Sequence, residues 1–360
     1  MLTINYIAEI ILPSKSAQSI QVMKMCDAFS KKKNKTNLHV FNKDKTRIYK
    51  NYNCSKKVKI ITYNINLNSF INRLIFAFNI LIKSLKKKNS ELYYSRSIVS
   101  AILLSQFKTN VILEIHHELK NFTYLIFWIT YKLNFLKNLK FVFFSKNLKK
   151  TFNLKNKSIV LDDAVDLHSF KVIKKNKVFN KTCVYTGSFS KGKGIEIIIK
   201  LSKIMPNINF HLYGDLTNSK YTKDHFAKQK NLKYLGFVEY KDMPKILNQY
   251  DLYLMPYSKK VYVRSNNLEV GKFMSPMKLF EYMAGKGVLM ASKMPVYNHI
   301  LNKKNSILIN QLSINLWKNN INNFFLNKKK YKHLSLNSNK IIKEFTWDNR
   351  VKKILKFINV

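Results

Sequence analysis

The stretch CVYTGSFSKGKGIEIIIKLSKIMPNINFHLYGD, residues 183–215, decides the fold. It opens with a short apolar run that ends at Gly187, and a turn containing Gly192 and Gly194 follows. Apolar residues then recur at helical spacing up to Ile204, and a second apolar run occupies residues 209–213. A strand, a glycine-rich turn, a helix and another strand make up the repeating unit of parallel α/β sheets.

The same alternation continues along the chain in both directions. A length of 360 residues predicts two domains at roughly 150 residues each. The polar stretch 168–181 separates them, so we expect an α/β protein with two doubly wound domains and a ligand at the carboxyl ends of the strands, in the cleft between the domains. The expected strands are 3–11, 38–41, 59–63, 91–94, 111–115, 141–144, 181–187, 209–213, 233–237, 251–255, 287–291 and 306–309, and the expected helices include 19–31, 70–86, 194–204, 243–248 and 277–284.

Composition excludes a disordered chain, because 46% of the residues are hydrophobic and 13% are aromatic. The 65 lysine and arginine residues exceed the 19 acidic ones by 46, which first suggests nucleic acid or anionic lipid as a partner. Both halves of the chain share the positive excess, however. Only five of the 65 basic residues are arginine, the residue best suited to clamping phosphates. A compositional bias with lysines on solvated faces is the simpler interpretation, and a function for the charge is the alternative.

The spacing of the cysteines and the length of the apolar runs indicate the cellular compartment to be expected. Cys26, Cys54 and Cys183 are isolated, which argues against a disulfide framework or a structural zinc site and favours a reducing cytoplasm. The apolar runs near the N-terminus and at residues 122–135 are shorter than the 20 or so residues that a membrane-spanning helix needs. We therefore expect no transmembrane segment.

All eight glycines lie between Gly187 and Gly287, so the first expected βα turn has none. An N-terminal dinucleotide-binding domain of an oxidoreductase would need G-x-G-x-x-G there, and is excluded. Gly187, Gly192 and Lys193 nearly complete a Walker A pattern, but Gly194 stands where Ser or Thr would hold magnesium. What remains is a lysine and backbone N–H groups suited to a metal-free diphosphate, or an ordinary tight turn.

The second informative stretch is MSPMKLFEYMAGKGVLMAS, residues 274–292. Ser275 is expected to cap a helix that starts at Pro276, and Gly285 is expected to end it in the left-handed conformation. Glu281 lies among apolar neighbours, where an unpaired carboxylate would cost several kcal/mol. Its partner is either a structural lysine or backbone group, or a pair of ligand hydroxyls.

With these residues in view, the chain resembles the family-4 retaining glycosyltransferases of GT-B architecture. The stretch SPMKLFEYMAGKGVLMASKMPVYNHIL is similar to the donor signature of that family, and YTGSFSKGKGIE, NLKYLGFVEYKDMPKILNQYDLYLMPY and FTWDNRVKKIL follow the family's order. The resemblance also takes in LPSKSAQSIQVMKMCDAF and VILEIHHELK in the first half. It implies an acceptor-binding domain at 1–167, a nucleotide-sugar-binding domain at 168–340 and a last helix, 341–360, that returns to the first domain.

The resemblance also implies roles for individual residues. Lys193 would contact the donor diphosphate, and Gly187 would let the loop approach it. Glu281 would hold the ribose hydroxyls, and His116 would sit near the donor sugar as a third catalytic candidate. The remaining donor contacts would come from the 187–188 turn, from the 236–238 turn beside the base, and from N–H groups at the start of the 276–284 helix: Gly187, Ser188, Gly236, Phe237, Val238, Ser275, Pro276, Met277, Lys278 and Leu279.

Some positions leave alternatives open. His116 could be a hydrogen-bonded core histidine, and His117 could be the true match. Asp163 lies where the family usually has D-G-V-D, here with Ala164 for glycine, and a turn-forming acidic pair explains it equally well. Ser188 stands where many members have an arginine, and Phe273 where many have a sugar-facing glutamate. How the sugar hydroxyls are held is therefore not implied.

The resemblance implies sugar transfer from a nucleotide-diphosphate donor to an acceptor hydroxyl, with retention of configuration and without a metal or other cofactor. Cell-surface polysaccharide, lipopolysaccharide or glycolipid assembly is the expected context, with a glycan or lipid-linked acceptor. The alternatives are a sugar-nucleotide epimerase or phosphorylase on a similar fold, and a basic binding protein for nucleic acid or an acidic polymer. We expect no nucleic-acid partner.

An anionic membrane surface is a further expected partner, which would place the protein in the cytoplasm or on the inner face of the cell membrane. Lysines end the expected 70–86 helix and aromatic side chains stud the next apolar segment. The competing interpretation is that the aromatic residues form core. The residues concerned are Lys83, Lys86, Lys87, Lys88, Phe122, Tyr124, Phe127, Trp128 and Tyr131.

Overall fold

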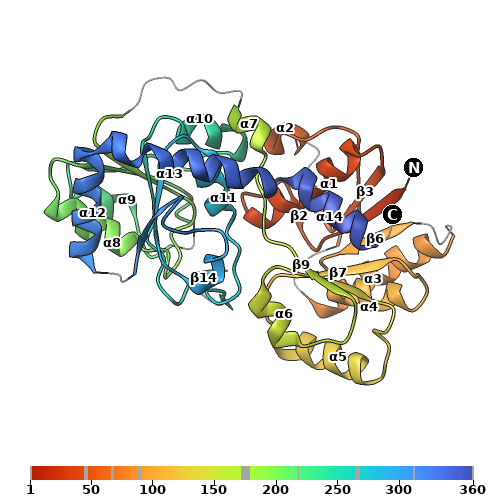
Figure 1. Cartoon of the computed structure of the whole chain (residues 1–360). Helices are drawn as coiled ribbons and strands as arrows, with labels where there is room; N and C mark the ends of the chain where they lie inside the picture. The colour runs from red at the N-terminus through yellow and green to blue at the C-terminus, as the bar shows by residue number, and fades with distance from the viewer. Residues whose placement is uncertain are drawn as a thin grey trace. The chain divides into compact units, whose positions relative to one another are not determined.

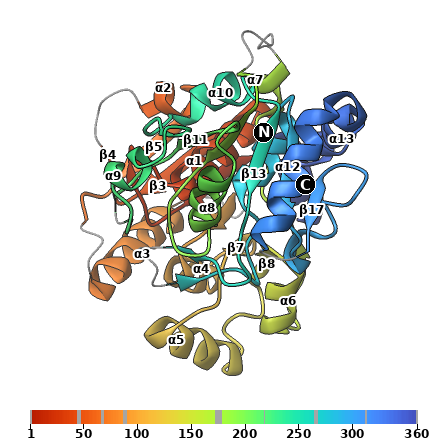
Figure 2. The same ribbon diagram turned by 90° about the vertical axis from the view of Figure 1, so that its left-hand side faces the viewer.

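The computed structural model describes residues 2–43, 48–65, 69–86, 91–171, 179–217, 219–263, 268–310 and 313–358. The chain forms two compact units (Figures 1 and 2). Unit 1 comprises Met1–Asp162 with Trp347–Val360, and unit 2 comprises Asp163–Thr346. The first change of unit thus falls after residue 162, where the sequence predicted 167, and the second falls after 346, where it predicted 340.

Unit 1 is built on a parallel sheet with the strand order β5-β3-β1-β6-β7-β8-β9. These strands are β1 (Thr3–Ile7), β3 (Lys35–Val40), β5 (Val58–Thr62), β6 (Leu92–Ser95), β7 (Val111–Ile115), β8 (Lys140–Phe143) and β9 (Ser158–Val160), and a two-residue pair joins β2 (Ile11–Leu12) to β4 (Asn42–Lys43). The helices are α1 (Ala17–Lys31), α2 (Ile48–Tyr52), α3 (Phe70–Leu85), α4 (Ile98–Ser105), α5 (Asn121–Lys132), α6 (Lys146–Phe152) and α14 (Trp347–Phe357).

Unit 2 repeats the plan with the strand order β12-β11-β10-β13-β16-β17, again parallel. Its strands are β10 (Thr182–Thr186), β11 (Asn209–Tyr213), β12 (Leu232–Tyr234), β13 (Leu252–Met255), β16 (Val288–Ser292) and β17 (Ile307–Ile309), with a small antiparallel pair β14 (Tyr262–Val263) and β15 (Leu268–Glu269). The helices are α7 (Leu167–Lys171), α8 (Ile195–Ile204), α9 (Lys223–Ala227), α10 (Met243–Leu247), α11 (Met277–Ala284), α12 (Ile314–Leu326) and α13 (Lys328–Ile341), and the 3-10 turns are η1 (Tyr240–Asp242), η2 (Pro295–Tyr297) and η3 (Ile342–Glu344).

The core of unit 2 lies on both faces of its sheet, as expected of a parallel sheet with helices on either side. Along β13, Tyr253 and Met255 pack with the α11 side, while Leu252 and Leu254 pack with the α8 and α12 side. Strand β10 alternates in the same way. All the residues of these two strands are therefore buried, which explains why they appear in the sequence as continuous apolar runs.

The strand order of each sheet indicates the edge at which a ligand would bind. In unit 2, β10 has β11 on one side and β13 on the other, so the chain changes direction across the sheet between β10 and β13. In unit 1 the equivalent point lies between β1 and β6. Ligands of doubly wound sheets bind beyond the carboxyl ends of the strands at such a point.

The predicted α/β fold is confirmed, and most predicted elements match to within a few residues. The expected strand 3–11 is instead β1 and β2, with residues 8–10 between them, and the short strands β4, β9, β14 and β15 were not predicted. Among the described residues, no helix has the length and apolar character required to cross a membrane.

Candidate functional site

The loop after β10 is shaped by close backbone packing. Gly187, Gly192 and Gly194 all have positive φ angles, of 121°, 82° and 80°. A Cβ atom on Gly192 would lie 2.0 Å from the Lys260 carbonyl oxygen, and one on Gly194 would lie 2.0 Å from that of Pro256. The tight-turn interpretation therefore accounts for the last two glycines. Gly187 differs, because what its Cβ would meet is the lysine side chain described below.

Lys193 lies between these glycines, and its side chain turns inward. Its Nζ is 3.4 Å from the Tyr257 hydroxyl and 4.5 Å from the centre of the Tyr257 ring. Tyr257 follows β13, so loop and tyrosine meet at the point where unit 2 changes direction. Burial lowers the pKa of Lys193 from its ordinary value near 10.5 to about 8. An anion placed beside Lys193 would restore the protonated form.

Lys278, in the first turn of α11, reaches the same place from the other side. A Cβ atom on Gly187 would lie 3.1 Å from its Nζ, which sits 3.4 Å from the centre of the Tyr185 ring and 5.2 Å from that of Tyr257. This Nζ is buried and, within the described ranges, has no hydrogen-bond acceptor. Burial, and then the charge of Lys193, hold the pKa of Lys278 well below its usual range.

Glu281 follows Lys278 by one helical turn and is also buried, at 7% exposure. In the part of the chain that the structure describes, its carboxylate receives no hydrogen bond. Burial raises the pKa of Glu281 to about 7, although Lys278 opposes the shift. Lys278 is thus the structural lysine that the sequence analysis considered as a partner for Glu281. It lies near the carboxylate as a charge but makes no hydrogen bond to it, so the carboxylate can still accept a hydrogen bond from a ligand.

Helix α11 is held at the end of β10 by a tyrosine. The Tyr282 hydroxyl accepts a hydrogen bond from the backbone N–H of Thr186, at 2.8 Å. Thr186 immediately precedes Gly187, so this bond fixes the register between the helix that carries Lys278 and Glu281 and the glycine loop. The site is therefore supported by a buried polar contact between two regular elements.

The two caps of α11 differ from the prediction, although the helix spans the predicted residues 277–284. Pro276 occupies the N-cap position and no side chain caps the helix, because the Ser275 hydroxyl accepts a hydrogen bond from the Asp163 N–H instead, at 2.9 Å. Pro276 has no N–H to offer a phosphate, and the Leu279 N–H donates to the Pro276 carbonyl. Met277 and Lys278 remain as backbone candidates at the start of the helix.

Gly285 is extended, with φ −68° and ψ 171°, so the predicted left-handed cap is wrong. A Cβ atom at this position would lie 2.5 Å from the Tyr253 hydroxyl oxygen. Packing against that aromatic ring, and not a left-handed turn, is what requires glycine here.

The 236–238 turn lies at the same edge of the sheet, beyond β12. The Gly187 N–H donates to the Tyr213 carbonyl and the Gly214 N–H donates to the Gly236 carbonyl, so the ends of β10, β11 and β12 are linked. Phe237 is 39% exposed, and Gly236 and Val238 are half-buried. Gly236, with φ 82°, has open space around its Cβ position. These residues present an apolar, partly open edge next to the lysine site.

His116 belongs to unit 1, where it follows β7. Its Nε2 is 3.1 Å from the Glu114 carboxylate and its ring lies 4.1 Å from that of Phe144. Burial first, and then Arg96, lower its pKa to about 3, so the imidazole is neutral near pH 7. His117 is half-buried, and its Nδ1 contacts the Glu118 carbonyl at 2.8 Å.

The remaining predicted positions are placed as follows. The Asp163 carboxylate accepts the N–H of Ala164 at 3.1 Å, a local turn contact. Ser188 is exposed, and its carbonyl accepts the Tyr185 hydroxyl at 2.6 Å. Phe273 is half-buried, and its N–H donates to the Val270 carbonyl. Neither Ser188 nor Phe273 brings a charge to the site.

Sequence reasoning missed the side chain of Lys278 and the two tyrosines, Tyr185 and Tyr257, that face it. The signal was available for the lysine, because it lies in an apolar helix one turn before Glu281. Its direction toward Gly187 depends on the packing of α11 against β10, which residue spacing along the chain does not reveal.

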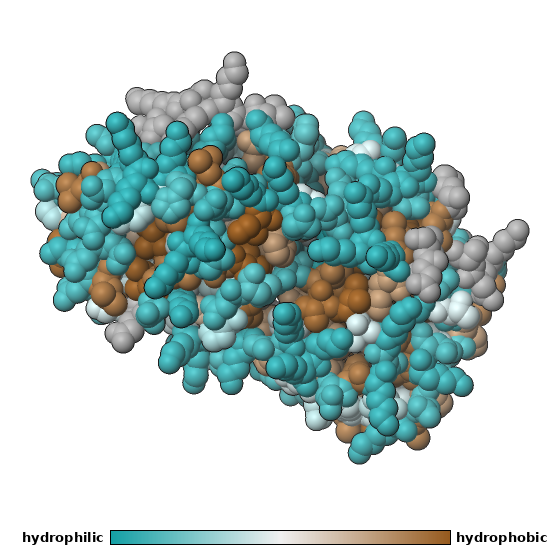
Figure 3. All heavy atoms as spheres, viewed as in Figure 1, coloured by the Kyte–Doolittle hydropathy of each residue, from teal (hydrophilic) through white to brown (hydrophobic). Residues whose placement is uncertain are grey.

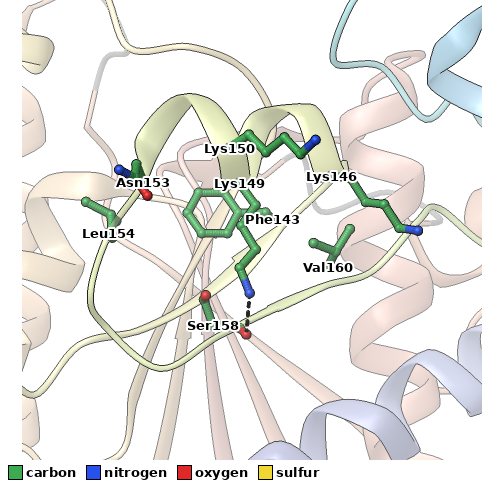
Figure 4. A pocket seen from close by; sticks show the side chains of 8 residues that line it. All are labelled: Phe143, Lys146, Lys149, Lys150, Asn153, Leu154, Ser158 and Val160. Carbon is green, nitrogen blue, oxygen red and sulfur yellow. Dashed lines mark hydrogen bonds between the residues drawn. The ribbon is translucent and has the colours of Figure 1, made fainter.

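A pocket of about 440 Å³ lies elsewhere, in unit 1 beside α6. Three exposed or partly exposed lysines surround an apolar floor, and the Lys149 Nζ donates to the Ser158 carbonyl at 3.2 Å (Figure 4). Its lining residues are Phe143, Lys146, Lys149, Lys150, Asn153, Leu154, Ser158 and Val160, and none was predicted as a site residue. The described residues also contain no cluster of three His, Cys, Asp or Glu side chains placed to hold a metal ion.

Comparison with known proteins gives a family for part of the chain and a fold for the whole of it. Residues 169–341, which include the lysine site, match the family described as glycosyl transferases group 1. An uncharacterised 41.2 kDa protein in the cps region of Klebsiella pneumoniae is 27% identical over 216 residues, and the match spans 55% of this chain and 56% of that protein.

Solved structures share the fold over the whole chain. A glycosyltransferase from Rickettsia africae is similar with a TM-score of 0.74 at 15% identity, covering 99% of this chain and 97% of that one. Anabaena HepE in complex with UDP and glucose gives 0.69 at 12% identity, covering 99% and 100%. The chain therefore has the GT-B fold of two Rossmann-like units, and its residues 169–341 are similar to the group 1 glycosyl transferases.

Proposed function

We propose that this protein transfers a sugar from a nucleotide-diphosphate sugar to an acceptor hydroxyl with retention of configuration. The observation that carries the proposal is the pair of buried lysines, Lys193 and Lys278, that meet beside Gly187. Both have pKa values lowered by burial, and Lys278 has no acceptor among the described residues. Two such side chains suit a ligand that brings two negative charges, as a diphosphate does.

Glycosyl transfer needs this arrangement because negative charge accumulates on the diphosphate as the bond to the sugar breaks. Lys193 and Lys278 would stabilise that charge as it develops, which lowers the barrier more than it tightens substrate binding. The side chain of Lys278 would thereby supply a second cation. From the sequence, the start of its helix was expected to contribute only backbone N–H groups. With two ammonium groups in place, we propose that no metal ion is required.

Glu281 would accept hydrogen bonds from the ribose hydroxyls of the donor. Its carboxylate is buried one turn from Lys278, so a donor whose diphosphate lies on the lysines would reach it with the nucleoside. Phe237 and its neighbours would lie along the base. His116 would act as a neutral hydrogen-bonding group toward the sugar, because a pKa of about 3 rules out a charged imidazole near pH 7.

The pathway is proposed from the relatives. One similar protein comes from a cps region, and a similar solved structure holds UDP and glucose. We propose a glycan or lipid-linked acceptor in the assembly of a cell-surface polysaccharide, in the cytoplasm or at its membrane. The base, the sugar and the linkage are left to experiment.

A thermal-shift panel of nucleoside diphosphates and their sugar conjugates tests the proposal. A ligand present at 100 times its dissociation constant stabilises the folded chain by about 2.7 kcal/mol, so at least one member should raise the melting temperature. EDTA should leave both the shift and turnover unchanged. A chain that ignores every nucleotide but binds oligonucleotides in a salt-sensitive way would instead be a basic binding protein.

A further inference from the structure

Helix α3 of unit 1 is apolar on two opposite faces. Its inner face is buried and consists of Phe76, Ala77, Ile80, Leu81 and Ser84. Its outer face has large apolar side chains at intervals of four, three, four and three residues, which places them in one stripe along the helix. These are Ile71, Ile75, Phe78, Ile82 and Leu85, with exposed fractions of 46 to 66%. A surface helix covered by water would carry polar residues in that stripe.

Helix α5 extends the same feature. Phe127 is its one buried residue, while Trp128 and Tyr131 are half-buried, so the interpretation of its aromatic residues as core holds for Phe127. The exposed large residues in and just after it are Phe122, Tyr124, Leu125, Ile129, Leu133 and Phe135. The two helices meet at their beginnings, where the rings of Phe70 and Phe122 pack edge to face at 4.7 Å.

We call these exposed residues of α3 and α5 the α3–α5 face. The views in Figures 1 and 2 both show α3, α4 and α5 as neighbours, and α4 packs against each of the other two. Hydrophobic atoms come to the surface of unit 1 at its lower end in Figure 3, where Figure 1 places α5. The exposed large residues of unit 2 lie on α8, α12, α13 and the turn after β12, with at most two on any one of them: Ile204, Leu235, Phe237, Leu316, Leu326 and Leu336.

The part of the sequence that carries the α3–α5 face has an excess of positive charge. Between residues 69 and 160 the sequence has sixteen lysine and arginine residues and three glutamates. Of the glutamates, Glu114 is buried and Glu91 accepts hydrogen bonds from Asn5 and Tyr93, so Glu118 is the exposed acid. Lysines lie at the ends of the two helices: Lys83, Lys86, Lys120 and Lys132. Lys87 and Lys88, which the sequence also suggested, lie outside the described residues.

We propose that the α3–α5 face binds the surface of an anionic lipid membrane, with its apolar side chains entering the headgroup region and the lysines facing lipid phosphates. An apolar stripe with tryptophan and tyrosine nearby and lysines at its margins has the chemistry of an interfacial helix. A protein partner of equal apolar area would leave the excess of positive charge unmatched, whereas an anionic bilayer matches it over the whole face. This inference concerns a surface distinct from the lysine site and does not rest on the proposed glycosyl transfer.

Flotation of the full chain with vesicles tests the inference. The wild-type protein should bind vesicles of phosphatidylcholine with phosphatidylglycerol, bind pure phosphatidylcholine more weakly, and be released by high salt. Trp317 and Trp347 are buried, so a blue shift in tryptophan emission on binding would report on Trp128 in α5. Changing Ile75, Phe78 and Ile82 together to Ser should reduce partitioning at least tenfold.

The matched control changes two equally exposed leucines of unit 2. Leu326→Ser with Leu336→Ser removes side chains that are 79% and 55% exposed, and should leave vesicle binding unchanged. A second variant, with Leu125 and Ile129 of α5 and Leu133 just after it changed to Ser, should act like the α3 variant. Because all these side chains are exposed, the melting temperatures should match the wild type.

Several results would overturn the inference. Equal binding to neutral and anionic vesicles, or no binding to either, would remove the membrane from consideration. Binding that survives in both the α3 and the α5 variants would place the contact elsewhere. A wild-type dimer that the α3 variant converts to a monomer, without any vesicle binding, would assign the face to a second copy of the chain.

Discussion

The two sheets treat buried charge at their carboxyl edges in opposite ways. In unit 1, Glu114 at the end of β7 is buried, but Arg350 of α14, Gln21 and Tyr6 donate hydrogen bonds to it, and the His116 Nε2 lies 3.1 Å away. Burial alone would raise the pKa of Glu114, yet the Arg350 guanidinium holds it well below its usual range. Arg350 also donates to the carbonyl oxygens of Leu161 and Asp162, so one network joins α14, β7 and the last strand region of unit 1.

In unit 2 the charges at the corresponding edge are left with few partners. Lys193 has one long contact with a tyrosine, Lys278 has none among the described residues, and Glu281 receives no hydrogen bond there. All three have pKa values shifted toward their neutral forms by burial. Removing one partner of a fully paired buried charge destabilises the fold, whereas incompletely partnered buried charges already cost stability in the ligand-free protein and suit a charged ligand.

The largest expected effect is on stability, in unit 1. Arg350→Ala removes the main partner of a buried carboxylate, which should lower the free energy of unfolding by roughly 3–5 kcal/mol. Urea denaturation measures it. The control is Arg73→Ala, which breaks a more exposed pair with Glu9 and should cost less than about 1 kcal/mol. Similar losses in both variants would mean that the Glu114 network does not support the fold.

The next effect is on turnover, in unit 2. Lys193→Ala should reduce kcat by roughly 100-fold to 1000-fold, because one donor to a developing negative charge is lost. The KM for the donor should change less, since the lysine acts most strongly on the transition state. Lys191→Ala is the matched control, because that lysine is two residues away and exposed. A Lys193→Ala enzyme with wild-type kcat would exclude the proposed role.

A smaller effect is expected for the ribose contact. Glu281→Gln keeps the shape of the side chain but removes a charged acceptor, which should weaken donor binding by about 1.5–3 kcal/mol. Calorimetry with the preferred donor would measure the loss. Since the carboxylate has a pKa of about 7, its ionised fraction grows between pH 6 and 8, so the affinity of the wild type relative to that of the variant should rise over this range. An identical pH dependence in the two proteins would show that Glu281 does not contact the donor.

The smallest effect has the opposite sign and separates the two regions most clearly. Lys278→Met replaces a buried amine that has no acceptor among the described residues with an apolar side chain of similar length, so the ligand-free protein should become more stable by about 1 kcal/mol. Arg350→Met, the corresponding change in unit 1, should destabilise. Loss of stability in the Lys278 variant would indicate that the lysine has a structural partner.

The sequence was sufficient for the fold because most of its elements obey local rules. Strands β7 and β11 and helix α11 begin and end where their apolar runs predict, and Lys193 is identifiable from the glycine spacing around it. Contacts between distant segments were not predictable. Arg350 meets Glu114 across 236 residues of sequence, and Tyr282 meets Thr186 across 96.

The exposure of the outer face of α3 was not predicted, although the helix itself was. Its 16 residues are apolar on both sides, so the pattern alone does not tell which side faces the sheet. Gly285 is another residue whose local sequence is misleading, because its position at a helix end predicts a left-handed cap. The ring of Tyr253, 32 residues away in sequence, requires a glycine there for reasons of space.

The central claim is that the buried lysines of unit 2 are recharged by a diphosphate, and proton uptake tests it most directly. Calorimetric titration of the preferred nucleotide-diphosphate sugar at pH 8.5, in buffers of different ionisation enthalpy, counts the protons taken up. Glu281 is already ionised at this pH, while Lys193, with a pKa of about 8, is mostly neutral. The account predicts uptake of roughly half a proton or more per site, reduced in Lys278→Met together with the affinity. Binding without proton uptake, at equal affinity in both proteins, would contradict it.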